Sequence, residues 1–203
     1  MNNNKNISPF TDFVSLVKRA RIFATEAHKG VYRKGKDENG EKLEYITHPI
    51  AVGKIIHTHK KSHRIAVLVA VAMLHDTVED CEWVTIEVIR QEFGDLIASL
   101  VEELTSDPKG LEQFGKEQYL INKMTFMSTW GLCIKLADRI HILSDVQSKI
   151  DSGKNSDIKW AIKYSTQTKN IVAALESKRA LTNTHKVLVE VIKEKIAPAL
   201  ELV

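Results

Sequence analysis

The sequence predicts an all-α fold, formed by a single domain over residues 1–203 with its core at about 12–180 and a C-terminal helix at 183–200. Three observations lead to this prediction. Apolar residues recur at helical spacing through nearly every segment. Ten consecutive apolar residues run from Ile65 to Leu74, and no stretch has the pattern of two or more paired strands. The chain is also long enough to bury a full core.

The expected helices follow one another with few interruptions. Pro49 is a favoured first-turn residue, Thr85 can cap a helix that ends before Gly94, and Asp95 can cap the next helix. The predicted helices cover residues 12–29, 48–57, 65–80, 85–93, 95–104, 112–127 and 129–147, with two more within 158–200. The charged segment 33–45 is expected to be a long loop or a short hairpin, and 106–110 and 151–156 are expected to be breaks or turns.

Composition limits the kinds of partner. The net charge is only +3, from 29 basic and 26 acidic residues, so charge alone indicates no nucleic-acid surface. Cys81 and Cys133 are too few for a disulfide framework, and the N-terminal residues lack the apolar region of a signal peptide. We therefore expect a cytoplasmic protein that acts on a small molecule, without nucleic-acid or membrane partners. The sequence leaves the oligomeric state open, a homo-oligomer included.

The apolar run 65–74 leads directly into ionisable residues. His75 and Asp76 follow it, and Glu79 and Asp80 come four residues later. If the helix continues, residues four apart are neighbours, so His75 lies beside Glu79 and Asp76 beside Asp80. Charged groups at the end of a buried helix are costly, and a bound cation would offset most of that cost. This segment is therefore expected to form half of a metal site.

His48 and Asp138 are candidates for the other half. Asp138 lies in the mostly apolar segment CIKLADRIHIL, where an aspartate also requires a reason. Two imidazoles and two carboxylates with open positions suit Mn²⁺, Fe²⁺ or another first-row ion better than a closed structural zinc site. Any one of these residues alone would more simply be a satisfied core histidine or a buried ion-pair partner. Their coincidence favours the metal site.

The order His48, His75-Asp76, Asp138 resembles the HD superfamily of metal-dependent phosphohydrolases. The flanking sequence is similar to one branch of it, the hydrolase domain of RelA/SpoT enzymes and the small alarmone hydrolases, including the metazoan SpoT homologue. The matching segments are AHKGVYRK (27–34), YITHPIAV (45–52), AMLHDTVED (72–80), the Phe-Gly of EFGDLIASLVEELTSD (92–107) and KLADRIHIL (135–143). This resemblance implies an HD-type helical bundle. It also implies hydrolysis of the 3′-diphosphate of guanosine tetra- or pentaphosphate, which releases pyrophosphate and GDP or GTP.

The resemblance also implies residue roles. His48, His75, Asp76 and Asp138 would hold Mn²⁺, while Glu79 and Asp80 would orient a water molecule and shuttle protons.

Further residues are assigned to the substrate. Arg33 and Lys34 match the basic pair of the family and would bind phosphates. Arg139, with Lys135, is a weaker candidate for phosphate, since like charges four residues apart are expected to point partly to solvent. Lys163 and Tyr164 resemble a basic-aromatic pair near the nucleotide, although a tyrosine packed between helices explains the pattern equally well.

Two positions depart from the family pattern. Ile142 stands where an asparagine commonly helps to bind the nucleotide, and Asp145 stands where a threonine is frequent. Replacing an amide with isoleucine removes a donor and an acceptor, so substrate identity is open at this point. The alternatives are another phosphorylated nucleotide, such as an adenine alarmone or NADPH, and a non-catalytic nucleotide-binding module.

Overall fold

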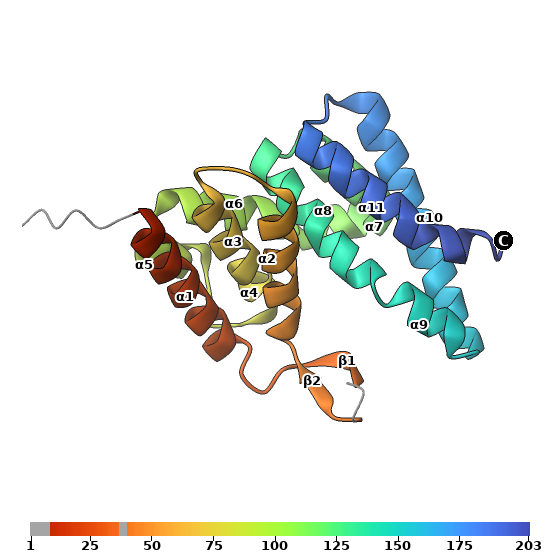
Figure 1. The fold of residues 1–203 in the computed structure, drawn as a ribbon, viewed down its shortest axis with the longest axis horizontal. Helices are drawn as coiled ribbons and strands as arrows, with labels where there is room; N and C mark the ends of the chain where they lie inside the picture. Colours follow the sequence, from red (N-terminus) through yellow and green to blue (C-terminus); the bar gives the residue numbers. More distant parts are fainter. Residues whose placement is uncertain (1–8, 37–39) are drawn as a thin grey trace, which may run out of the picture. The chain divides into compact units, whose positions relative to one another are not determined.

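The computed structural model describes residues 9–36 and 40–203 (Figure 1). Helices make up most of this part of the chain, and its sheet is a two-stranded antiparallel hairpin. The predicted all-α class is confirmed, and the segment near 33–45 forms the short hairpin. The chain divides into two compact units, Met1–Thr105 and Ser106–Val203. The extent of the predicted domain, 1–203, stays a prediction.

The first unit is built around α3 (Figure 1). Every residue of α3 from Leu68 to Leu74 is buried, as expected for a helix that is apolar on all sides. Helices α1, α2 and α6 pack against α3, and α5 packs against α6. In chain order the elements are α1 (Pro9–Ala27), β1 (Tyr32–Lys36), β2 (Lys42–Glu44), α2 (Thr47–His59), α3 (Ile65–Leu74), α4 (Thr77–Asp80), α5 (Ile86–Phe93) and α6 (Asp95–Leu104).

The boundary between α5 and α6 agrees only partly with the prediction. The Thr85 hydroxyl accepts a hydrogen bond from the Val88 backbone N–H and caps α5 as expected. Asp95 was expected to cap α6, but it is the first helical residue and its carboxylate accepts a hydrogen bond from Arg90 instead. Gly94 holds the cap position because its φ of 84° suits a residue without a Cβ.

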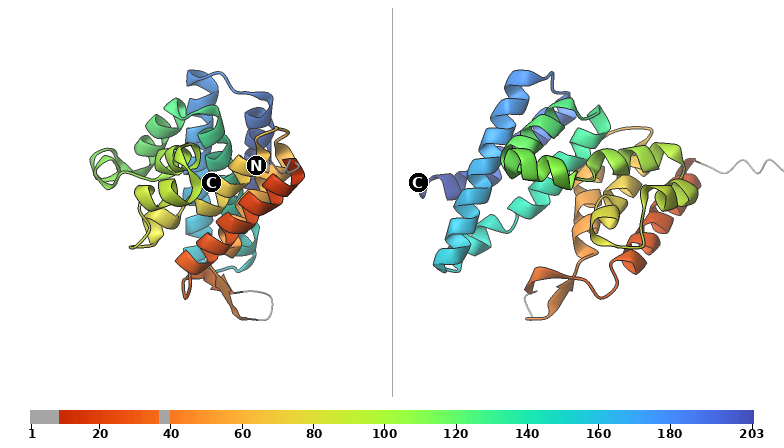
Figure 2. Two further views of the ribbon diagram at one scale, coloured as in Figure 1. Left: turned by 90° about the vertical axis from the view of Figure 1, so that its left-hand side faces the viewer. Right: turned by 180° about the vertical axis from the view of Figure 1, so that it is seen from behind.

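The second unit is a layer of packed helices, drawn from green to blue in Figure 2. Helix α8 packs against α11, and α10 contacts α7, α9 and α11. The elements are α7 (Pro108–Phe126), α8 (Thr129–Leu143), α9 (Val146–Asp151), α10 (Asn155–Lys178) and α11 (Asn183–Leu200). None of the helices in residues 9–36 and 40–203 has the length and apolar character required to cross a membrane.

Two helix boundaries in this unit differ from the prediction. Helix α7 begins at Pro108, inside the expected break, because the Asp107 carboxylate accepts hydrogen bonds from the N–H groups of Lys109 and Gly110. Helix α8 ends at Leu143 and not near 147. There the Ser144 N–H bonds to the carbonyls of both Ile140 and His141, and the Asp145 N–H bonds to that of Ile142, so the last turn tightens to i,i+3 bonding.

Candidate functional site

Three possible metal ligands converge in the first unit. His48 and His75 are buried and Asp76 is half-buried, and one ligand atom from each lies within 4.8 Å of the others. His48 comes from the first turn of α2, where its N–H donates to the carbonyl of Tyr45. His75 and Asp76 come from the junction of α3 and α4. The sequence predicted all three.

The α3–α4 junction corrects the prediction of a helix through Asp80. Helix α3 ends at Leu74, because the Thr77 hydroxyl donates to the Leu74 carbonyl and His75 Nδ1 donates to the Ala72 carbonyl. These side chains use carbonyls of the last turn, which a continuing helix would bond to backbone N–H groups. Asp76 and Asp80 still lie one turn apart, since the Asp80 N–H bonds to the Asp76 carbonyl.

The imidazoles of the cluster present nitrogen atoms to the Asp76 carboxylate. A carbonyl can only accept, so His75 Nδ1 carries the hydrogen and Nε2 of the neutral ring holds a lone pair. This Nε2 lies 3.2 Å from Asp76 Oδ1, and His48 Nε2 lies 3.4 Å from Asp76 Oδ2. A lone pair facing a carboxylate needs a proton or a cation between them. The donor set of imidazole nitrogen and carboxylate oxygen fits a divalent first-row ion.

Tyr45 is a site residue that sequence reasoning did not single out. Its hydroxyl donates a 2.7 Å hydrogen bond to Asp76 Oδ2. Burial, followed by the carboxylates of Asp76 and Asp80, raises the pKa of Tyr45 far above the ordinary value, so the phenol keeps its proton. Its position three residues before His48, in the matched segment YITHPIAV, was the available signal.

Asp80, the expected proton shuttle, lies beside these residues with a half-exposed side chain. Its Oδ2 is 3.8 Å from Nε2 of His28, a buried imidazole whose Nδ1 lies 2.9 Å from the Ala24 carbonyl at the end of α1. Burial, followed by the nearby charge of Asp76, raises the pKa of Asp80 above that of an ordinary aspartate. A carboxyl group with a raised pKa is suited to proton transfer near neutral pH. Glu79 is exposed on the same short helix.

The basic pair predicted to bind phosphates lies on the hairpin. Arg33 and Lys34 both belong to β1, where Arg33 is half-buried and Lys34 is exposed. The hairpin base is tied to the site, since the Tyr45 N–H donates to the Val31 carbonyl. Because its side chain is exposed, Lys34 is accessible to an anionic ligand.

Asp138, the predicted fourth ligand, belongs to the second unit. It is buried on α8, and Lys135 Nζ lies 3.0 Å from its Oδ2. This contact is the buried ion pair that the sequence analysis gave as the simpler alternative for a single residue. The place of Asp138 as the fourth metal ligand stays a prediction.

Arg139 differs from the expectation that it points partly to solvent. Only 4% of it is exposed, its Nη1 donates to the Thr168 hydroxyl, and its guanidinium lies 4.9 Å from the ring centre of Tyr164. Partners on α10 give the guanidinium a hydrogen bond and a cation–π contact inside the unit. Its contact with a phosphate stays a prediction.

Tyr164 packs within the second unit. Its ring stacks on Trp160 with centres 5.3 Å apart, and burial raises its pKa to about 12. This is the helix-packing alternative of the sequence analysis, and a nucleotide contact stays a prediction. Lys163 is exposed, and Ile142 is half-buried on α8.

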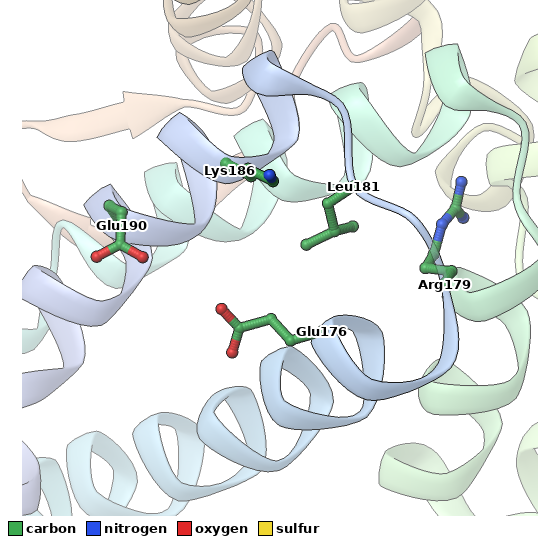
Figure 3. A pocket seen from close by; sticks show the side chains of 5 residues that line it. All are labelled: Glu176, Arg179, Leu181, Lys186 and Glu190. Carbon is green, nitrogen blue, oxygen red and sulfur yellow. The ribbon is translucent and has the colours of Figure 1, made fainter.

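A cavity of about 260 Å³ lies in the second unit, outside the predicted site residues (Figure 3). Its lining combines acidic and basic side chains with one leucine, from Glu176, Arg179, Leu181, Lys186 and Glu190. Lys193 forms ion pairs with both glutamates. Both glutamates of the lining therefore already have a partner within the protein.

Comparisons with known proteins agree with the sequence motifs. Residues 20–124, just over half of the chain, match the model of a protein family described as HD domain. The guanosine-3′,5′-bis(diphosphate) 3′-pyrophosphohydrolase MESH1 of Xenopus tropicalis is 34% identical over 133 residues, which cover 66% of this chain and 70% of that protein. The Homo sapiens protein of the same name is 35% identical over 127 residues, which cover 63% and 67%.

A solved structure is similar over most of the chain. It is described as a metazoan orthologue of SpoT that hydrolyses ppGpp and has a role in starvation responses. It matches with a TM-score of 0.68 and 26% sequence identity, covering 89% of this chain and 96% of that chain. The helical fold is therefore shared with this structure.

Proposed function

The chain belongs to the HD domain family, and on this premise we propose that it hydrolyses the 3′-diphosphate of guanosine tetra- or pentaphosphate. The products are pyrophosphate and GDP or GTP. One observation carries the proposal: His48, His75 and Asp76 converge within segments that match the alarmone hydrolases. Relatives named for the same reaction support it.

The proposed cofactor is Mn²⁺, with Fe²⁺ or another first-row divalent ion as an alternative. His48, His75 and Asp76 would hold it together with Asp138. When bound, such an ion supplies Lewis acidity, which lowers the pKa of a coordinated water toward neutrality. The buried imidazoles of His48 and His75 keep their nitrogen atoms away from competing solvent.

The proposed proton-transfer groups are Asp80 and Glu79. Asp80 stands one helical turn after Asp76 and has a raised pKa, so it can take a proton from the attacking water and return it to the leaving group. Glu79 is exposed on the same turn and would orient the water.

The proposed substrate contacts come from basic and aromatic side chains. Arg33 and Lys34 on the hairpin would bind the phosphates through charge-assisted hydrogen bonds. Arg139, Lys163 and Tyr164 would contact the nucleotide from α8 and α10. We place this reaction in the cytoplasm, with a small nucleotide as the partner.

A second candidate substrate is favoured by Ile142. An isoleucine offers no hydrogen bond at a position where the family commonly has an amide, so the pocket has less means to select guanine. An adenine alarmone or NADPH would use the same metal and phosphate contacts.

A nucleotide panel tests the proposal. Purified protein with Mn²⁺ is incubated separately with guanosine tetraphosphate, guanosine pentaphosphate, an adenine alarmone and NADPH, and the products are separated by chromatography. We expect pyrophosphate with GDP or GTP from the guanosine substrates, at the highest kcat/KM of the panel. The Asp76→Ala variant should be inactive.

The remaining outcomes assign the function differently. A higher kcat/KM for the adenine alarmone or NADPH would move the substrate to that class. Nucleotide binding without turnover of any substrate would indicate a binding module, and the hydrolase proposal would be wrong.

A further inference from the structure

Tyr45 connects several parts of the site. Its N–H donates to the Val31 carbonyl before β1, and its carbonyl accepts from the N–H of His48. Its hydroxyl donates to Asp76 Oδ2 at 2.7 Å. One residue thus connects the base of the hairpin with two residues of the metal cluster.

The ring of Tyr45 is held on two sides by imidazoles. It stacks on His28, with ring centres 4.7 Å apart and planes at 21°, and it meets His48 edge to face at 5.9 Å. His28 in turn has its Nδ1 at 2.9 Å from the Ala24 carbonyl, at the end of α1. These contacts fix the direction in which the phenol hydroxyl points.

The hydroxyl also decides which way the Asp76 carboxylate faces. Because Oδ2 accepts from Tyr45, rotation of the carboxylate would break a short hydrogen bond, and Oδ1 stays 3.2 Å from His75 Nε2. Hydrogen bonds to a ligating carboxylate orient it for the metal, and losing such a bond costs about 10–100-fold in metal affinity or activity.

We propose that Tyr45 is the positioning residue of the metal centre: its hydroxyl orients Asp76 toward the metal, and its backbone ties the basic hairpin to His48. The inference rests on the metal centre of the proposed function. It adds that a single residue connects the hairpin that carries Arg33 and Lys34 with the proposed metal ligands.

The Tyr45→Phe variant tests this role, since it keeps the ring and the backbone bonds and removes only the hydroxyl. Mn²⁺ affinity is measured without substrate, from the electron paramagnetic resonance signal of free Mn²⁺. We expect about 10–100-fold weaker binding than in the unmodified protein. Hydrolysis of guanosine tetraphosphate by this variant should recover as the Mn²⁺ concentration is raised, because a higher concentration fills the weaker site.

Tyr119→Phe is the matched control. Tyr119 is also a largely buried tyrosine, and its hydroxyl makes a 2.7 Å hydrogen bond, accepted from the Asp107 N–H in the second unit. Removing the Tyr119 hydroxyl should lower the thermal stability of the metal-free protein to an extent similar to that of Tyr45→Phe. Mn²⁺ affinity should stay at the unmodified value.

The outcomes separate this inference from the proposed function. Equal Mn²⁺ affinity in Tyr45→Phe and the unmodified protein would overturn the inference, even if guanosine tetraphosphate is hydrolysed. A lower kcat at unchanged Mn²⁺ affinity would also overturn the inference, and would indicate that the Tyr45 hydroxyl acts on Asp80. Weaker Mn²⁺ binding in a protein that leaves guanosine tetraphosphate intact would support the inference while the substrate assignment fails. No measurable binding of a divalent ion by the unmodified protein would overturn both.

Discussion

Loss of Asp76 should abolish the stabilisation of the protein by Mn²⁺. His48 follows the hairpin, whereas His75 and Asp76 follow α3, so only the folded chain brings the three ligands together. A metal that binds the folded chain alone contributes its binding free energy to folding. At a Mn²⁺ concentration of about 100 times Kd, the contribution is about 2.7 kcal/mol. In a chain of this size, about 1 kcal/mol shifts Tm by about 2–4 °C, so Mn²⁺ should raise Tm by about 5–11 °C.

Thermal unfolding followed by circular dichroism measures this increment as the difference in Tm between Mn²⁺ and a chelator. The unmodified protein should show the full increment, and Asp76→Ala should show almost none. Glu82→Gln is the control, because Glu82 is an exposed acid near the end of α4 and lies outside the ligand cluster. An Asp76→Ala increment equal to that of the Glu82→Gln control would refute Asp76 as a ligand.

Four further outcomes are expected. Glu79→Gln and Asp80→Asn should retain Mn²⁺, measured by metal analysis, and lose about 10²–10⁴-fold in kcat; turnover at the unmodified rate would remove the proton-transfer role. Burial raises the pKa of Asp80, and a base must be deprotonated to act. As the pH is lowered, kcat should therefore begin to fall at a pH above the range in which an ordinary aspartate titrates. The pH–rate profile of Asp80→Asn should lack this acidic decrease. His28→Asn keeps a donor toward the Ala24 carbonyl but loses Nε2 beside Asp80, so kcat at saturating Mn²⁺ should fall by up to about 10²-fold, the scale for a misplaced group; the exposed His63→Asn is the kinetic control. Ile142→Asn should lower KM for guanosine tetraphosphate with little change in kcat in steady-state assays; an unchanged or raised KM would indicate a different substrate.

Local sequence signals were sufficient for much of the fold and for the convergence of His48, His75 and Asp76. Apolar periodicity predicts the helices, because burial of an apolar face is what stabilises them. The continuous apolar run predicted that α3 is buried, and residues 68–74 are. The ionisable residues directly after such a run could be recognised as a site, and His48, His75 and Asp76 do converge.

Side-chain contacts, some between distant residues and some local, account for what the sequence did not predict. Arg139 was expected to reach solvent because only its neighbour Lys135 was visible in the pattern, whereas its partners Thr168 and Tyr164 lie on α10. The end of α3 at Leu74 depends on the particular directions of the Thr77 and His75 side chains. Periodicity contains no information on which carbonyl a side chain will reach.

In the first unit the proposed metal ligands are held rigidly, whereas the proposed proton-transfer residues are accessible. His75 and Asp76 leave the most deeply buried helix of the unit, and a close-packed core allows little displacement of the residues that it anchors. Glu79 and Asp80 follow within one turn and are exposed at the end of α4, whose first residue, Thr77, is buried. Metal ligands need fixed distances, whereas groups that exchange protons need contact with the reacting molecules. In the proposed mechanism the break after Leu74 serves both needs, because it ends the buried helix at the proposed ligands, and Glu79 and Asp80 reach the surface one turn later.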